Sequence, residues 1–289
     1  MEQSQTTALV LGGGGVTGIA WLIGVLAGLA RYGFVLPRNC HFIGTSAGSV
    51  VSTELANGIS PDSLLNRQLD TQATSSESFR AYSQREADQK NQVLMQKTGG
   101  DLVLARLRIG AFALRKAGAD LGPRREIIRS RLTLLDWPVR KLSLIAVDAQ
   151  SAEHVTLTRD SGLPLIDAVM ASCAVPGVWP TVPWNGRLLM DGGIRSMTNA
   201  DLASGSSNVL VLAPLGYSQE NPVSGHLQAE IKELERAGAR VDVVTPDAVS
   251  LSEIGDNVLD PSRSQASALA GLAQASDVCN SISAPWFCT

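Results

Sequence analysis

Acidic residues are missing from the start of this 289-residue chain, where none lies between Glu2 and Glu54. The absence weighs against a dinucleotide-binding oxidoreductase, although the stretch from Gly13 to Gly18 reads G-x-G-x-x-G. That fingerprint expects an acidic residue about twenty positions further on, which contacts the ribose. Arg38 would suit a ribose phosphate instead, but the next predicted strand ends in a serine turn where the ribose contact would lie. A nucleotide site is therefore the weaker interpretation of these glycines.

Histidine and cysteine are also scarce, with three and four copies. The cysteines lack the spacing of metal ligands, so we expect no metal site and no cofactor. A chain of this length does not depend on disulfides, so free thiols are expected, with a Cys279–Cys288 bridge as the alternative. The formal net charge of −3 provides no general basic surface, so we expect no nucleic-acid partner.

Charge is absent from Ala8 to Ala30, a run of 23 residues that is long enough to span a bilayer. Seven of these residues are glycine, and the four in a row from Gly12 to Gly15 would break a membrane helix. A buried strand, a glycine loop and a buried helix explain the run better. The first five residues lack the basic region of a signal peptide, so we expect a cytoplasmic protein.

The chain alternates segments typical of strands and of helices. A strand at 7–11, a glycine loop at 12–18 and a helix at 19–32 precede a strand at 41–44 and a helix that ends near 57. This repetition predicts an α/β fold with a mostly parallel, doubly wound sheet. Further strands are expected at 141–149, 153–159, 187–190, 209–213 and 240–245, the first two as a hairpin, and further helices at 165–173 and 261–278.

The segment from about 62 to 135 is different in composition. It is polar and has no strand pattern, so we expect one domain over 1–289 with a helical insertion, or lid, at about 62–135. Its second half is basic, with ten Lys and Arg residues and three acidic residues between Arg106 and Lys141. Apolar residues interspersed with these charges predict peripheral contact with an anionic membrane. A helix packed on the core with a solvated basic face is the alternative explanation.

One turn has the setting of a nucleophile. Ser46 lies in a G-x-S-x-G pattern with Gly44 and Gly48, after an apolar strand and before residues at helical spacing. Such a strand-to-helix turn exposes the serine hydroxyl, and the start of the helix favours negative charge nearby. A structural turn rich in Gly and Ser is the alternative.

A second turn is suited to an oxyanion. Gly13, Gly14 and Gly15, followed by Gly18, come after a strand and open a helix. Backbone N–H groups converge at a helix N-terminus, and glycine allows an anion to approach closely. Four consecutive glycines cost more chain entropy than a simple turn requires, which favours an oxyanion site.

Two residues are candidates for the base. His226 completes the order Ser46, Asp191, His226 of an α/β-hydrolase triad, but several strands normally precede the nucleophile in that fold and only one does here. Asp191 ends a predicted strand and precedes Gly192 and Gly193, so its carboxylate can lie across the strand ends. A carboxylate can accept a hydroxyl proton where burial raises its pKa.

Considered together, residues 11–18, 44–48 and 191–193 resemble the motifs of the patatin-like phospholipases, as do 171–176 and Trp179-Pro180. The resemblance covers about residues 6–215, and the motifs resemble those of the bacterial type of patatin-like acyl hydrolase. It implies a three-layer α/β/α fold around a mostly parallel sheet. It also implies a serine lipid acyl hydrolase of the phospholipase A or lysophospholipase type, which needs no cofactor and acts on a lipid or another ester.

The resemblance assigns roles to individual residues. Ser46 is expected to be the nucleophile and Asp191 its base, in a Ser–Asp dyad, with the N–H groups of Gly13, Gly14 and Gly15 as the oxyanion hole. A patatin-like fold that binds or scaffolds without catalysis is the alternative.

Two positions depart from the family pattern. Thr17 stands where the family usually has Arg or Lys, so a positive charge beside the oxyanion loop is missing. Trp21 replaces a frequent histidine, which we expect to affect packing only.

Overall fold

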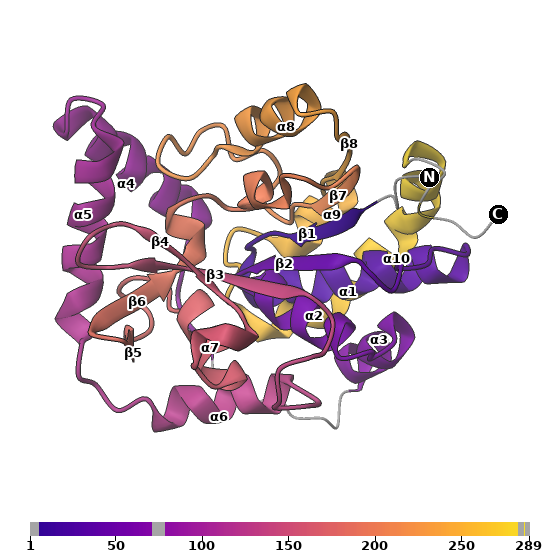
Figure 1. The fold of residues 1–289 in the computed structure, drawn as a ribbon, viewed down its shortest axis with the longest axis horizontal. Coiled ribbons are helices and arrows are strands. Elements are labelled where there is room, and N and C mark those ends of the chain that lie inside the picture. Colours follow the sequence, from indigo (N-terminus) through magenta and orange to yellow (C-terminus); the bar gives the residue numbers. More distant parts are fainter. Residues whose placement is uncertain (1–5, 71–78, 283–285, 287–289) are drawn as a thin grey trace.

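The computed structural model describes residues 6–70, 79–282 and 286, and its centre is an eight-stranded sheet (Figure 1). The strand order is β5-β6-β3-β2-β1-β7-β8, with β4 paired to β3. The five strands from β3 to β8 in this order are parallel, whereas β4, β5 and β6 pair antiparallel. The strands are β1 (Thr7–Leu11), β2 (His41–Thr45), β3 (Leu142–Asp148), β4 (His154–Leu157), β5 (Val182–Trp184), β6 (Arg187–Asp191), β7 (Asn208–Leu212) and β8 (Arg240–Val244). The predicted mostly parallel sheet is confirmed.

Helices cover both faces of the sheet, which gives three layers. Alternate strand residues point to opposite faces, so Leu9 and Leu11 join the larger apolar cluster and Ala8 and Val10 the smaller one. The larger cluster contains residues of α1 (Gly15–Arg31), α2 (Ala47–Ala56), α3 (Pro61–Leu69), α7 (Leu165–Ser172), α9 (Ala248–Ile254) and α10 (Ser264–Ser281). The smaller cluster includes α8 (Leu227–Arg236).

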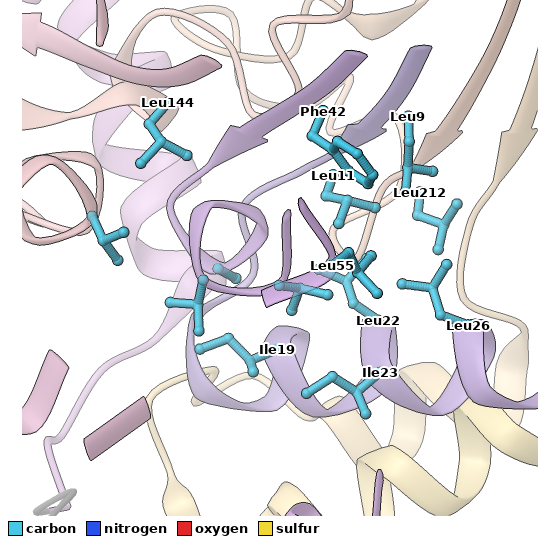
Figure 2. Close-up of a cluster of buried hydrophobic side chains, with 14 of the residues drawn as sticks. Leu9, Leu11, Ile19, Leu22, Ile23, Leu26, Phe42, Leu55, Leu144 and Leu212 are labelled. Carbon is cyan, nitrogen blue, oxygen red and sulfur yellow. The ribbon is translucent and has the colours of Figure 1, made fainter. Parts of the chain in front are cut away.

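Helix α1 is the centre of the larger cluster. Figure 2 shows its side chains Ile19, Leu22 and Leu26 beneath the strand residues Leu9 and Leu212. The charge-free run is therefore β1, a loop and α1, as predicted. No helix in the described part of the chain has both the length and the apolar character needed to cross a membrane.

Small residues let α1 and α10 approach closely. A Cβ atom at Gly28 would overlap the side chain of Ala275, and one at Gly24 would overlap the backbone of Ala268. A Cβ at Gly271, on the other helix, would meet the backbone of Trp21. This contact places α10 against the middle and second half of the helix that begins at the glycine-rich loop.

The described residues between α2 and β3 form helices joined by loops. This segment contains α3, α4 (Gln84–Lys97), α5 (Leu102–Ala113) and α6 (Gly122–Arg131), and no strand lies within its described ranges, 57–70 and 79–141. Helix α6 runs beside α7, and α4 and α5 stand at the end of the sheet that carries β4 and β6 (Figure 1).

Several elements differ from the sequence-based predictions. Helix α1 begins at Gly15 and not at Ile19, because the Gly14 carbonyl already accepts a helical hydrogen bond from the Gly18 N–H. The hairpin of β3 and β4 is present. Strand β5 and helices α8 and α9 were not predicted; β5 has only three residues and contains Pro183, which lacks the N–H that a strand normally donates.

Candidate active site

Strands β2 and β6 meet end to end along one edge of β3. In β2, Thr45 lies opposite Ile145, and in β6, Asp191 lies opposite the next residue, Ala146. Strand β4 occupies the other edge of β3 at both positions, so β2 and β6 share the remaining edge. Because β2 is parallel and β6 antiparallel to β3, their carboxyl ends converge. Ser46, which follows β2 directly, therefore faces the last residue of β6.

Ser46 occupies a strained turn between β2 and α2. Its backbone has φ 51° and ψ −115°, a region that non-glycine residues rarely adopt. The surrounding hydrogen bonds hold it there: the Ser46 N–H donates to Ser172 Oγ at 3.0 Å, and its carbonyl accepts from Ser49 Oγ at 2.6 Å and Cys173 Sγ at 3.2 Å. A Cβ at Gly48 would overlap the carbonyl of Leu11. These contacts fix the backbone of the turn and leave Ser46 at the wall of a cavity.

The Ser46 hydroxyl donates a hydrogen bond to Asp191. The distance from Ser46 Oγ to Asp191 Oδ2 is 2.7 Å, and Asp191 Oδ1 accepts from the N–H of Gly193 at 2.8 Å. Asp191 is only 5% exposed. Burial raises the pKa of its carboxyl from 3.8 to about 6, against the opposing effects of the Gly193 N–H, the Ser46 hydroxyl and the charge of Arg124. The structure thus brings together the two residues predicted as a dyad, 145 positions apart in sequence.

The glycine-rich loop lies next to Ser46, but its N–H groups are not equivalent. The N–H of Gly13 donates to the carbonyl of Met197 at 2.8 Å, so the prediction of Gly13 as an oxyanion donor needs correction. Within the described part of the chain, the N–H groups of Gly14, Gly15 and Ala47 have no hydrogen-bond acceptor, and all three residues line the cavity above Ser46. Ala47 was missed, although its position directly after the serine is where such hydrolase turns provide a donor.

The conformation at Gly15 explains why the loop needs glycine. Gly15 has φ 61°, and a Cβ there would overlap the carbonyl of Val258. The same carbonyl accepts hydrogen bonds from the N–H groups of Val16, at 2.7 Å, and Thr17, at 3.2 Å. Because Val258 binds the next two N–H groups, it fixes the loop in the orientation that leaves Gly15 facing the cavity.

The remaining motif glycines have structural positions. Gly18 donates its N–H to the carbonyl of Gly14 at 2.8 Å inside the first turn of α1. A Cβ at Gly44 would overlap Ser52, and one at Gly192 would overlap the carbonyl of Ile145. Close backbone approach therefore accounts for these glycines.

Asn199 connects the serine turn to the aspartate turn and was not found from the sequence. Its side-chain amide donates to Thr45 Oγ1 at 3.1 Å and to the carbonyl of Gly192 at 3.3 Å. Asn199 is fully buried and has φ 53°. The residues that precede Ser46 and follow Asp191 are thus held by one amide group.

The histidines do not take part in this arrangement. His226, the candidate third member of a triad, lies just before α8, with its Nε2 2.9 Å from the carbonyl of Val223 and 3.3 Å from Arg106. His226 is not among the residues that line the cavity. His41 contacts Ser143 at 2.8 Å, and His154 is exposed on β4. In this structure His226 therefore does not complete a triad with Ser46 and Asp191.

The cavity above Ser46 is narrow and has a volume of about 90 Å³. Tyr82, Trp179 and three arginines, which the sequence analysis did not assign to the site, form part of its wall. The arginines are Arg80, Arg124 and Arg131. Thr17, in contrast, is fully buried and does not line the cavity.

Nothing in the described residues suggests a bound metal. No group of three or more His, Cys, Asp or Glu residues in that part of the chain is arranged to hold a metal ion. Of the suggested Cys279–Cys288 pair, Cys288 lies outside the described residues.

Comparison with known proteins identifies the family. The model of the patatin-like phospholipase family matches residues 9–204, more than half of the chain. No curated protein matches the sequence. Among solved structures, the chain is similar to VipD from Legionella pneumophila, with 16% identity, a TM-score of 0.42, and coverage of 96% of this chain and 67% of VipD.

The type III effector protein ExoU is also similar, with 15% identity and a TM-score of 0.42. That alignment covers 96% of this chain but only 53% of the ExoU chain, so the protein spans about half the length of this neighbour. The chain belongs to the patatin-like phospholipase family, a family of lipid acyl hydrolases.

Proposed function

We propose that the protein hydrolyses lipid acyl esters with Ser46 as nucleophile and Asp191 as general base. The observation that carries this proposal is the 2.7 Å hydrogen bond from Ser46 Oγ to Asp191 Oδ2 at the base of a cavity. A general base works best when its pKa is close to the working pH, and burial raises the pKa of Asp191 to about 6.

The reaction has two steps. Asp191 accepts the hydroxyl proton while Ser46 Oγ attacks the ester carbonyl carbon, and the tetrahedral intermediate then expels the alcohol, which takes up a proton from Asp191. Water next attacks the acyl-enzyme with Asp191 again as base, and the fatty acid leaves as Ser46 regains its proton. The N–H groups of Gly14, Gly15 and Ala47 supply the oxyanion hole, since they face the cavity and hold no other acceptor among the described residues.

An adjoining groove is suited to the acyl chain. Its volume is about 1010 Å³, and it shares Tyr82, Val175, Ile194 and Met197 with the wall of the cavity above Ser46. Apolar side chains of α4 and α5, including Val93, Leu94, Ile109 and Phe112, line its other side. A chain in this groove would place its ester in the narrow cavity, which supports cleavage of a phospholipase A or lysophospholipase type.

The groove also supports one domain over 1–289, in which the segment at about 62–135 acts as lid. Helices α4 and α5 of that segment form the groove, and Arg124 and Arg131 of α6 reach the cavity above Ser46. Substrate access would then depend on these helices.

Peripheral contact with an anionic membrane is supported by α5 and the residues after it. Val103 and Phe112 are 58% and 44% exposed, and Arg108, Arg115 and Lys116 are exposed near them. Arg106, in contrast, turns inward and donates to the carbonyl of Val223 at 3.0 Å. Sedimentation with anionic and with neutral vesicles tests the contact, and equal recovery would refute it.

Labelling with a fluorophosphonate tests the nucleophile and the base. The wild type should be labelled, Ser46→Ala should not, and Asp191→Asn should react at least about a hundredfold more slowly, as general-base catalysis contributes roughly that much. His226→Ala is the matched control and should label as the wild type does. A wild type that does not react would favour the binding or scaffold alternative, and loss of labelling in His226→Ala would restore the triad.

A further inference from the structure

Glu230 occupies an inward position of α8 that normally belongs to an apolar side chain. It lies between Leu227 and Leu234 at helical spacing, and all three residues are buried. Glu230 is only 6% exposed, and α8 packs against the short helix Ala200–Ala203. Burial of a carboxyl group costs free energy unless hydrogen bonds compensate for it. The hydrogen bonds of Glu230 therefore indicate why a carboxyl group stands at this position.

One oxygen of Glu230 holds the residues on both sides of Asn199. Glu230 Oε2 accepts a hydrogen bond from Thr198 Oγ1 at 2.8 Å and another from the backbone N–H of Ala200 at 3.0 Å. Between these two contacts Asn199 has φ 53°, a left-handed conformation that needs support from its surroundings. The carboxyl group thus fixes the backbone before and after a strained residue.

Asn199 extends this anchoring to both turns of the candidate active site. Its side-chain amide donates to Thr45 Oγ1 in the serine turn and to the carbonyl of Gly192 in the aspartate turn. Its Oδ1 accepts from Arg195 at 2.8 Å, which determines that the NH₂ end of the amide faces the two turns. Thr45 Oγ1 in turn donates to the carbonyl of Thr198 at 3.3 Å. A continuous set of hydrogen bonds therefore joins α8 to both turns.

We propose that Glu230 is a positioning residue, which acts through Asn199 to hold the Ser46 hydroxyl and the Asp191 carboxylate at hydrogen-bond distance. This role rests on the proposed function, in which those two groups react together. Glu230 lines neither the cavity nor the groove, so it contributes without contact to the substrate. A displacement of about 1 Å in a catalytic arrangement can reduce the rate about a hundredfold, so the backbone that Glu230 fixes affects turnover.

Hydrolysis of p-nitrophenyl butyrate measures this role. Glu230→Ala should lower kcat about ten- to a hundredfold and leave KM within about twofold of the wild type, because only the geometry of the reacting groups changes. Glu230→Gln should retain most of the wild-type kcat, since an amide oxygen can accept the same two hydrogen bonds. Glu235→Ala is the matched control and should behave as the wild type, because Glu235 is exposed on the same helix.

A double variant tests whether Glu230 acts through Asn199. If it does, Glu230→Ala combined with Asn199→Ala should have about the same kcat as the slower single variant, because residues that act as a unit are not additive. Thr198→Val removes one of the two donors to Glu230 and retains the shape of the side chain. It should lower kcat by a smaller factor and should add nothing to Asn199→Ala, so it answers the question even if Glu230→Ala does not fold.

Hydrogen exchange measured by mass spectrometry separates this role from the proposed function, because it needs no catalysis. Peptides that cover residues 43–49 and 189–200 should exchange faster in Glu230→Ala than in the wild type or in Glu235→Ala, since both turns open more easily. Thr198→Val should show a smaller increase in the same peptides. A wild type that neither hydrolyses the ester nor reacts with a fluorophosphonate would refute the proposed function, but the comparison of exchange rates would stand.

Three results would overturn the positioning role. The first is a wild-type kcat in both Glu230→Ala and Thr198→Val, or unchanged exchange in both peptides. The second is a double variant in which the two losses multiply, which would mean that Glu230 and Asn199 act separately. The third is a Glu230→Gln variant as slow as Glu230→Ala, which would contradict the role of the two accepted hydrogen bonds.

Discussion

Replacing Asp191 with Asn should slow fluorophosphonate labelling at least about a hundredfold and at the same time make the protein more stable at pH 8. Burial raises the pKa of this carboxyl from 3.8 to about 6. A shift of about two units, at about 1.4 kcal/mol per unit, corresponds to about 3 kcal/mol. The same burial that would suit Asp191 to its proposed role as base therefore reduces the free energy of unfolding at pH values where the carboxyl is ionised.

The sign follows from proton binding. Since the folded-state pKa lies above the unfolded-state value, the folded protein holds this proton more tightly, and the associated stabilisation is fully present below about pH 4. It falls as the pH rises from about 4 to about 6 and is lost above pH 6. Asparagine does not ionise, so Asp191→Asn should exceed the wild type in unfolding free energy by up to about 3 kcal/mol at pH 8 and match it near pH 4.

Urea unfolding of both proteins at pH 4.5 and pH 8 measures this difference, because all other ionisable groups are common to the two chains. The rate of fluorophosphonate labelling supplies a second measurement. In the wild type it should rise about tenfold from pH 5 to its plateau, with a midpoint near pH 6, as the carboxylate forms. A labelling rate that is flat between pH 5 and 7, or a variant that is less stable than the wild type at pH 8, would refute the reasoning.

Three further substitutions test other parts of the structure. Asn199→Ala should lower the turnover number about ten- to a hundredfold with little change in KM, because it loosens the geometry around Ser46 without touching substrate; an equal rise in KM would contradict a positioning role. Thr17→Val should raise the free energy of unfolding by about 1 kcal/mol in urea titrations, because the Thr17 hydroxyl is buried with no hydrogen-bond partner among the described residues; a loss of stability would show an unrecognised partner. Gly28→Val should destabilise the protein by about 1–3 kcal/mol or more through overpacking against α10, whereas Ala273→Val, at an exposed position of α10, should stay within about 0.5 kcal/mol of the wild type; similar melting temperatures would mean that the helices can separate at little cost.

Local sequence signals were enough to predict the strand-to-helix turn at Ser46. Gly44 lies near the end of β2 and Gly48 at the start of α2, and a G-x-S-x-G pattern at a strand-to-helix junction is typical of such a turn. The sequence of Asp191, Gly192 and Gly193 after a strand was similarly informative. Helix α8 was missed although its alternation of apolar and charged residues at helical spacing is visible in the sequence.

The arginines that line the cavity above Ser46 could not be predicted in the same way. Arg124 lies in a basic segment, and its sequence is compatible with a solvated or membrane-facing surface. Whether such a side chain faces solvent or a cavity depends on how α6 packs against α7 and on the position of Trp179, which is 55 residues away. Nearby sequence could not predict either that the Gly13 N–H is already occupied, because its acceptor, the carbonyl of Met197, lies far away in the chain.

The meeting of β2 and β6 on one edge of β3 has a consequence during synthesis. Ser46 leaves the ribosome long before Asp191, which follows it by 145 residues. Until β3 has joined β2 and β6 has paired next to it, the serine has no proposed base. On the proposed mechanism, a nascent or partly unfolded chain would therefore lack ester reactivity until β2 and β6 lie on the same edge of β3.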